Sequence, residues 1–176
     1  MKLLAALVGI LFLIGISGIS GIPSVTAVGG VSLFNNMTNT DGTDRYHGSG
    51  QELGVKFYSD LNGKINAIRY YKYEPSPRLE SGRLWNAQGV LMQVVEFPAG
   101  TATGWQEAVF PVPVEIAANT TYIASYDAQG MWHETQGFFN APWVSNGLHV
   151  LTSEGGSVYG PSPGVFPPYN ASPVNY

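Results

Sequence analysis

Glycine, proline, asparagine and aspartate divide this sequence into short apolar runs. After Ala27, no stretch of about ten residues keeps a helical period. The chain contains 22 Gly and 12 Pro, residues that interrupt helices and mark turns. Within the runs, apolar and polar residues tend to alternate, which is typical of a strand with one buried face. We therefore expect an all-β protein.

The alternation predicts two hairpins and several further strands. The run ELGVKFYS at 52–59 is followed by Asn62-Gly63, a strong hairpin signal, and by a return strand at 65–73. A second hairpin is predicted from 83–85 to 90–97, turning near Gly89. Further strands are predicted at 104–112, 120–128, 131–139, 148–152 and 157–160. This spacing favours a single domain built as a two-sheet, jelly-roll-like β-sandwich.

Charge and cysteine content exclude several classes of function. Cysteine is absent, which removes disulfides, thiolate catalysis and zinc-thiolate sites. The net charge is −4 and no lysine or arginine cluster occurs, so no nucleic acid is expected as a partner. Only 11% of residues are charged. The surface is therefore either polar but uncharged, or covered by glycans or neighbouring subunits.

The first 27 residues have the order of a secretory signal peptide. One lysine, Lys2, precedes an apolar run from Leu3 to Ile16, and small residues end at Val25-Thr26-Ala27. Two other readings remain open. The uncharged run from Leu3 to Ile22 is long enough to span a membrane as an uncleaved anchor, and it could instead persist as an apolar segment buried between subunits. In each case we expect an extracellular or cell-surface protein, with membrane contact only through residues 1–27 if these are retained.

These features divide the chain into three parts. Residues 1–27 are the signal peptide or retained apolar segment, residues 28–50 an extended N-terminal arm and loop, and residues 51–176 the β-sandwich domain.

Several motifs in one order resemble a known family. ELGVKFYSDLNGKINAIRYYKY, GRLWNAQGVLM, GWQEAVFPVPVEIAANTTYIASYDAQG and GFF resemble the bacterial secreted family named domain of unknown function 4082, over most of Leu33 to Tyr176. The resemblance implies a β-sandwich of exported and cell-surface proteins that often accompanies immunoglobulin-like and other binding modules. It implies no reaction. Members of the family usually continue with an apolar, alternating strand after the point where this sequence ends, at Tyr176.

The missing last strand suggests a function. Either that strand lies outside this sequence, or a neighbouring chain supplies it by donor-strand complementation. A donor is available in the segment 24–36, which is flexible at its glycines and carries Val25, Val28, Val31, Leu33 and Phe34. Head-to-tail contacts of this kind propagate into a fibre. The leading hypothesis is therefore a non-enzymatic structural subunit whose main partner is itself, in a homo-oligomer or helical filament. The alternative is a secreted carbohydrate-binding or adhesion module that acts as a monomer.

Motifs for catalysis are absent. His47, His133 and His149 form no metal-binding pair, and no nucleophile-elbow motif occurs. We expect no enzyme activity and no cofactor. A weak calcium candidate is the loop 35–44, where Asn39, Asp41 and Asp44 supply oxygen atoms around Gly42. Its register fails the EF-hand pattern, and turns rich in these residues are common without a metal.

Aromatic residues and sequons are the remaining candidates. Trp132 and Trp143, in surroundings rich in glycine and proline, are predicted to stack on sugar rings, whereas Trp85 and Trp105 are predicted to lie in the core. Sequons for glycosylation occur at Asn36, Asn119 and Asn170, all in predicted loops.

Overall fold

A computed structural model describes residues 8–13, 30–35, 37, 42–72, 80–98, 103–171, 174 and 176. These residues form fourteen strands and one 3-10 turn, η1 (Thr152–Glu154). The strands are β1 (Val8–Leu13), β2 (Val31–Ser32), β3 (Thr43–Tyr46), β4 (Gln51–Ser59), β5 (Gly63–Lys72), β6 (Ser81–Asn86), β7 (Leu91–Glu96), β8 (Gly104–Ile116), β9 (Tyr122–Ala128), β10 (Met131–Glu134), β11 (Trp143–Ser145), β12 (Leu148–Val150), β13 (Ser157–Tyr159) and β14 (Tyr169–Ala171). None of the described residues belongs to a helix long and apolar enough to cross a membrane.

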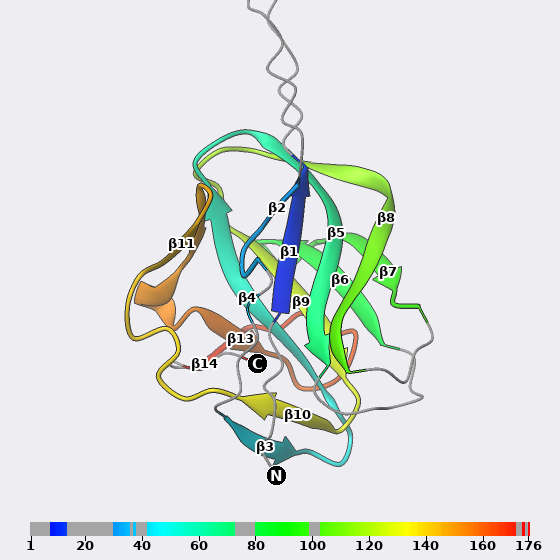
Figure 1. The fold of residues 1–176 in the computed structure, drawn as a ribbon. Helices are drawn as coiled ribbons and strands as arrows, with labels where there is room; N and C mark the ends of the chain where they lie inside the picture. Colours follow the sequence, from blue (N-terminus) through cyan, green and yellow to red (C-terminus); the bar gives the residue numbers. More distant parts are fainter. Residues whose placement is uncertain are drawn as a thin grey trace, which may run out of the picture.

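The strands form a β-sandwich, so the predicted fold class is confirmed. The smaller sheet has the order β2-β1-β5-β8, and the larger has the order β11-β12-β4-β9-β6-β7, with β13 joining β4 to β14. Figure 1 shows the smaller sheet in front of the larger one, with the separate β3–β10 pair across one end. All pairings between described strands are antiparallel.

The core follows from the alternation along the central strands. In β4, Leu53, Val55 and Phe57 are fully buried. The core cluster also includes residues of β5, β6 and β9, among them Ile65, Ile68, Leu84, Ala124 and Tyr126. Side chains of successive strand residues point to opposite faces, so the residues that alternate with Leu53, Val55 and Phe57 in β4 lie on the outer face of the larger sheet.

One of the two predicted hairpins is correct. β6 and β7 pair with each other, and the turn between them contains Gly89 with φ 81°. The predicted hairpin at Asn62-Gly63 is wrong, because β4 pairs with β9, β12 and β13 whereas β5 pairs with β1 and β8. A two-residue hairpin of the I′ type needs positive φ at both turn residues, and Asn62 and Gly63 are not among the residues with positive φ. The Asn62 side chain instead accepts a hydrogen bond from the Ala118 N–H at 2.8 Å, and the chain passes from one sheet to the other.

The arm predicted at 28–50 lies partly within the sandwich. Leu33 and Phe34 are fully buried in the main core. The Phe34 ring packs against Phe138, Phe139 and Trp143, with ring centroids 6.1, 6.3 and 5.6 Å away. This aromatic cluster joins the arm to the loop after β10 and to β11.

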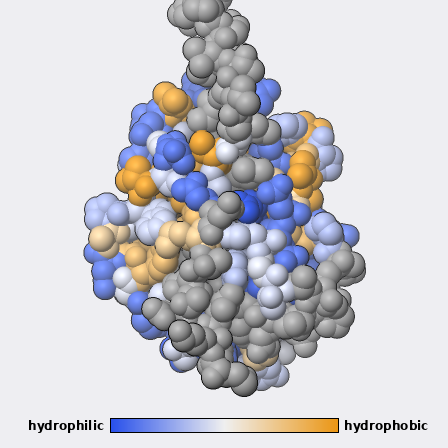
Figure 2. Space-filling model, in the orientation of Figure 1, coloured by the Kyte–Doolittle hydropathy of each residue, from blue (hydrophilic) through white to orange (hydrophobic). Residues whose placement is uncertain are grey.

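On the face of the molecule drawn in Figure 2, the visible apolar groups are scattered rather than continuous. Figure 2 shows hydrophobic side chains in small, separate groups among hydrophilic ones on this face. On the end strand β8, Val109 and Val112 are 63% and 66% exposed. Pro111 and Pro113 lie beside them in the same strand. Proline lacks the N–H that a further strand would need, so these residues protect this edge from pairing with another chain.

Candidate functional site

Strand β1 occupies an inner position of the smaller sheet. It pairs antiparallel with β5 from Val8 opposite Tyr70 to Leu13 opposite Lys64. On its other side it pairs with β2, with Leu11 opposite Ser32 and Phe12 opposite Val31. Figure 1 shows β1 between these two strands on the front of the molecule. Without β1, β5 would expose its N–H and C=O groups along a sheet edge that no proline protects. We call the space that β1 fills between β2 and β5 the β1 groove.

The donor segment predicted from the sequence lies beside this groove instead. Val31 belongs to β2, and Leu33 and Phe34 are buried in the core of their own chain. Two hydrogen bonds fix this segment: the Trp143 indole N–H donates to the Leu33 carbonyl at 2.9 Å, and the Ser145 hydroxyl to the Ser32 carbonyl at 3.0 Å. Val25 and Val28 lie outside the described residues. In this chain, residues 31–34 therefore contribute to the wall of the groove rather than to a free donor.

The two tryptophans predicted to stack on sugars are packed inward. Trp132 in β10 is 8% exposed and belongs to the main core. Trp143 is half-buried against Phe34 and Phe138, with ring centroids 5.6 and 5.0 Å away. Trp132 therefore has no open ring face in this structure, because it lies where the small β3–β10 pair covers one end of the core. Of the two tryptophans assigned to the core, Trp85 is 5% exposed and Trp105 is partly buried against the core.

The predicted acceptor asparagines are placed at the surface where they are described. Asn119 is exposed in the turn between β8 and β9, with φ 54°. Asn170 is exposed in β14. Asn36 lies outside the described residues. Both asparagines are therefore accessible to solvent, as an attached glycan would require.

The calcium candidate is only partly described. Asp44 lies in β3, and its carboxylate contacts Nδ1 of the buried His133 at 2.9 Å. Asn39 and Asp41 lie outside the described residues. Within the described part of the chain, no group of three His, Cys, Asp or Glu side chains is placed to hold a metal ion.

A buried polar network, which no sequence motif predicts, lies on the outer face of the larger sheet. Glu52 of β4 is fully buried. Its carboxylate accepts hydrogen bonds from the Ser125 hydroxyl at 2.5 Å and the Gly164 N–H at 2.8 Å, and it pairs with the Arg83 guanidinium at 3.0 Å. Arg83 also reaches Asp127, at 3.5 Å. Each residue occupies an outward position on its own strand, so only the strand order β4-β9-β6 brings them together.

The side chains of this network bond to one another and are largely shielded from solvent. Burial raises the pKa of Glu52, although Arg83 and the Ser125 hydrogen bond act in the opposite direction. Burial also raises the pKa of Asp127, which the Ser81 N–H and Arg83 partly offset. The loop that holds Gly164 covers the carboxylate of Glu52, and the Gly160 N–H donates to the Glu52 carbonyl at 2.7 Å. The arrangement therefore fastens the segment 160–168, which we call the strap, to the outer face of the sheet.

A second buried ionic group lies where β5 ends and β6 begins. The Lys72 ammonium is 3.4 Å from the Glu80 carboxylate, and both side chains are largely buried. The Tyr70 hydroxyl also donates to Glu80. Burial and the negative charge of Asp127 raise the pKa of Glu80 to about 7, and burial lowers the pKa of Lys72.

The raised pKa of Glu80 predicts that stability falls as the pH rises. Its ordinary value is 4.5, so between that pH and about 7 the unfolded chain releases the proton while the folded chain keeps it. The unfolded state then binds fewer protons, and the free energy of unfolding declines across this window by up to about 3 kcal/mol, after which Glu80 contributes no further slope. Glu80→Gln removes this contribution, because an amide does not titrate.

Urea unfolding at about pH 5 and about pH 8 measures this effect. The decline in the free energy of unfolding is expected to be clearly smaller for Glu80→Gln than for the unaltered protein. Glu52 and Asp127 also have raised pKa values, but they are present in both proteins, so the difference between the two isolates Glu80. Equal declines in the free energy of unfolding for the two proteins would contradict the raised pKa of Glu80.

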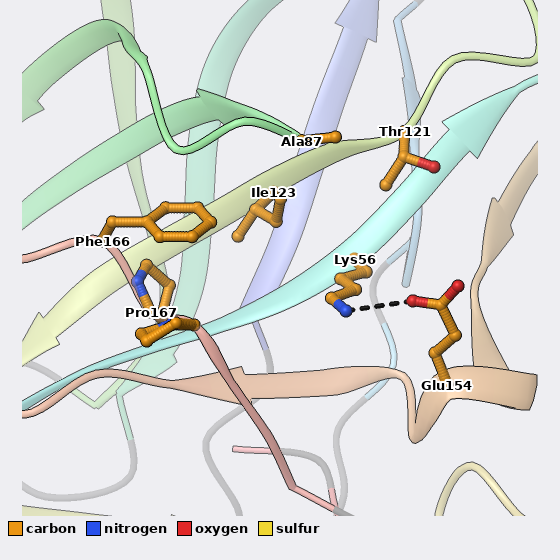
Figure 3. Close-up of a pocket in the computed structure, with 8 residues that line it drawn as sticks. Lys56, Ala87, Thr121, Ile123, Glu154, Phe166 and Pro167 are labelled. Carbon is orange, nitrogen blue, oxygen red and sulfur yellow. Dashed lines mark hydrogen bonds and ion pairs between the residues drawn. The ribbon is translucent and has the colours of Figure 1, made fainter.

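A small cleft lies between the strap and the outer face of β4 and β9. Its volume is about 290 Å³, and it is lined by Lys56, Ala87, Thr121, Ile123, Glu154, Phe166, Pro167 and Pro168. Figure 3 shows the Phe166 ring directed toward Ile123 on one side, and Lys56 paired with Glu154 on the other. The ion pair measures 3.0 Å. The cleft thus combines an apolar wall with polar groups of both charges.

The last described residues pack into the core. Val174 and Tyr176 are 5% and 6% exposed and belong to the main cluster. The Ser157 hydroxyl donates to the Val174 carbonyl. Burial raises the pKa of the Tyr176 phenol far above its ordinary range. Val174 and Tyr176 therefore lie against the core of their own chain.

Comparison with known proteins finds one family that matches most of the chain. The family described as Domain of unknown function (DUF4082) matches residues 37–176. No curated protein matches the chain. The matched region includes β3 to β14, whereas β1 and β2 precede it.

Proposed function

The chain belongs to the family Domain of unknown function (DUF4082), and from this premise we propose that it is a non-enzymatic, extracellular structural subunit that assembles head-to-tail by exchanging strand β1. The observation that carries the proposal is the place of β1. It lies before the region that the family covers, yet it fills an inner position of the sheet. The donor is thus moved from the predicted segment 24–36 to Val8–Leu13.

The connection after β1 is long enough for exchange. Residues 14–30 separate β1 from β2. At full extension a connection of this length reaches about 55 Å, which exceeds the diameter of a small domain. The backbone pairs of β1 with β5 and β2 would be the same whether β1 comes from its own chain or from another copy. Exchange of an identical element is a low-cost route to assembly for this reason.

The geometry of exchange is head-to-tail. The donor, β1, and the acceptor, the β1 groove, are different surfaces of one chain. Each copy that gives its strand to a neighbour leaves its own groove open for the next copy. Such contacts propagate unless the rotation between copies closes a ring, and they match the filament predicted from the sequence.

Processing of the N-terminus decides whether β1 is available. Cleavage after Ala27, the site that the signal-peptide pattern indicates, would remove β1 from the exported protein. Strand exchange requires one of the two readings without cleavage, namely the reading in which the apolar segment is retained and buried between subunits. The intact mass of the exported protein distinguishes the two, because only the retained form contains residues 8–13.

A cysteine-mixing experiment tests the exchange. The chain has no cysteine of its own, and Leu11 lies opposite Ala67 in the β1–β5 register. Cα atoms of antiparallel partners are close enough for a disulfide. One protein carries only Leu11→Cys and another only Ala67→Cys. When the two are unfolded, mixed, refolded at high concentration and oxidised, we expect a disulfide-linked heterodimer, because this bond forms only if β1 of one chain enters the groove of the other.

Two controls define the outcome. Ser153→Cys in η1 replaces Ala67→Cys in a matched mixture, and no heterodimer above background is expected, since Ser153 is exposed and does not pair with β1. The double variant Leu11→Cys/Ala67→Cys shows how often the strand stays in its own chain. Exclusive formation of the internal disulfide, with no heterodimer at any concentration, would refute exchange. That result would favour the alternative, a monomeric carbohydrate-binding or adhesion module.

A further inference from the structure

We infer that the cleft beneath the strap is a binding site for one ring of a neutral saccharide. The cleft is independent of the β1 groove, because its lining comes from β4, β9 and the residue before it, η1, the turn after β6 and the strap. None of the aromatic residues singled out from the sequence as sugar-stacking candidates contributes to it.

The size of the cleft fits one sugar ring. Its volume of about 290 Å³ is just below the range for small-molecule sites, roughly 300–1,000 Å³. One ring of an oligosaccharide fills such a space, and the neighbouring rings continue into solvent. The lining is too small for a drug-sized apolar ligand.

The chemistry of the lining matches the two faces of a sugar. A pyranose ring presents an apolar C–H face and a rim of hydroxyl groups. Phe166, Pro167 and Ile123 form an apolar wall against which the C–H face packs. On the opposite side, Thr121, Lys56 and Glu154 supply donors and acceptors for hydroxyl groups. Figure 3 shows these two sets facing each other across the cleft.

The charge of the site selects a neutral ligand. Lys56 and Glu154 form an ion pair at 3.0 Å, with their side chains 18% and 52% exposed. The pair leaves no net charge for a phosphate or a carboxylate to neutralise. Each partner still has hydrogen-bonding capacity beyond the pair, because an ammonium has three donors and a carboxylate about four acceptor positions.

The walls of the cleft are fixed before a ligand enters. Hydrogen bonds of the Gly160 and Gly164 N–H groups to Glu52 hold the strap. The Phe166 ring packs edge-on against Trp85, 5.6 Å between centroids. On the other wall, the Lys56 N–H donates to the Gly156 carbonyl at 2.9 Å, and Glu154 belongs to the 3-10 turn η1. A preformed site does not spend binding energy on ordering its own residues.

Titration of the full chain with three oligosaccharides tests the inference. The protein is made in a host without N-glycosylation, because Thr121 is also the hydroxyl residue of the Asn119 sequon. The probes are cellotriose, maltotriose and chitotriose, and binding is followed by amide chemical shifts. We expect at least one probe to shift Thr121, Ile123 and Phe166, with an affinity that changes little with salt.

Variants make the result decisive. Phe166→Ala is expected to weaken binding about tenfold or more, whereas Phe166→Tyr, which keeps an aromatic face, retains it. The matched control is Tyr169→Ala, an exposed aromatic residue of β14 outside the cleft, which leaves binding unchanged. Lys56→Met, which keeps an unbranched side chain but removes the ion pair, is also expected to weaken binding. The inference is overturned if no probe, at millimolar concentration, changes the amide chemical shifts of the cleft residues. It is also overturned if a probe binds Phe166→Ala as tightly as it binds the unaltered protein. Neither result affects strand exchange, which the cysteine-mixing experiment tests separately.

Discussion

Replacing Phe34 by alanine is expected to lower the free energy of unfolding by about 3–5 kcal/mol, the usual cost of removing a large buried aromatic ring. Phe34 is fully buried and lies at the centre of the cluster formed with Phe138, Phe139 and Trp143. The cavity left behind cannot close easily, because the three neighbouring rings, all within residues 138–143, also pack against one another. Urea unfolding of the two proteins measures the difference.

The control for Phe34 comes from the same short segment. Met37 is 39% exposed, and Met37→Ala is expected to change stability by no more than about 0.5 kcal/mol. A loss below about 1 kcal/mol for Phe34→Ala would mean that the segment does not belong to the folded domain. The measurement therefore also tests whether the domain begins before residue 51, as the burial of Leu33 and Phe34 indicates.

Replacing Arg83 by methionine is expected to cost about 3–5 kcal/mol as well, for an electrostatic reason. The change leaves the carboxylates of Glu52 and Asp127 without the cation that both contact. Loss of one member of a buried ionic group is costly because the remaining charge is neither solvated nor paired. The variant protein is expected to regain part of the loss at low pH, where the two carboxyl groups take up protons.

Two comparison variants separate this effect from the loss of packing. Lys64→Met breaks the surface pair with Glu115, whose side chains are 41% and 80% exposed, and it is expected to cost well under about 1 kcal/mol. In the triple variant Glu52→Gln/Arg83→Met/Asp127→Asn, the buried charges are removed together, and we expect much of the stability to return. A triple variant as unstable as Arg83→Met would show that packing of the arginine, rather than its charge, is what matters.

The strands could be predicted from the sequence because each alternation is local. The run 52–59 indicates a strand with Leu53, Val55 and Phe57 on one face, and these residues are fully buried. The pairing of strands was harder to predict. The β6–β7 hairpin follows from its turn, whereas the strong signal at Asn62-Gly63 connects two different sheets. A turn signal indicates where the chain reverses, but the burial of both strands decides with which neighbours they pair.

The residues of the candidate sites were mostly not predictable. Glu52, Arg83 and Asp127 come from strands far apart in sequence, and each one resembles an ordinary outward-facing charge. The sugar-facing residue proposed here, Phe166, lies in a proline-rich loop that the sequence marks only as irregular. The glycine-rich surroundings of Trp132 predict an exposed ring, yet Trp132 is 8% exposed, because packing by the β3–β10 pair overrides local composition.

The N-terminal segment shows most clearly what each level of description decides. Composition alone determined that residues 3–16 are apolar and must leave water, whether in a membrane, a cleaved signal or a protein core. It also determined that the rest of the chain forms strands, because period and turn residues act over a few neighbours. Only the tertiary structure assigned Val8–Leu13 to the place between β2 and β5. The unpaired edge of a strand can pair with any apolar strand that comes near it. Whether a given segment of the chain comes near that edge depends on the whole fold.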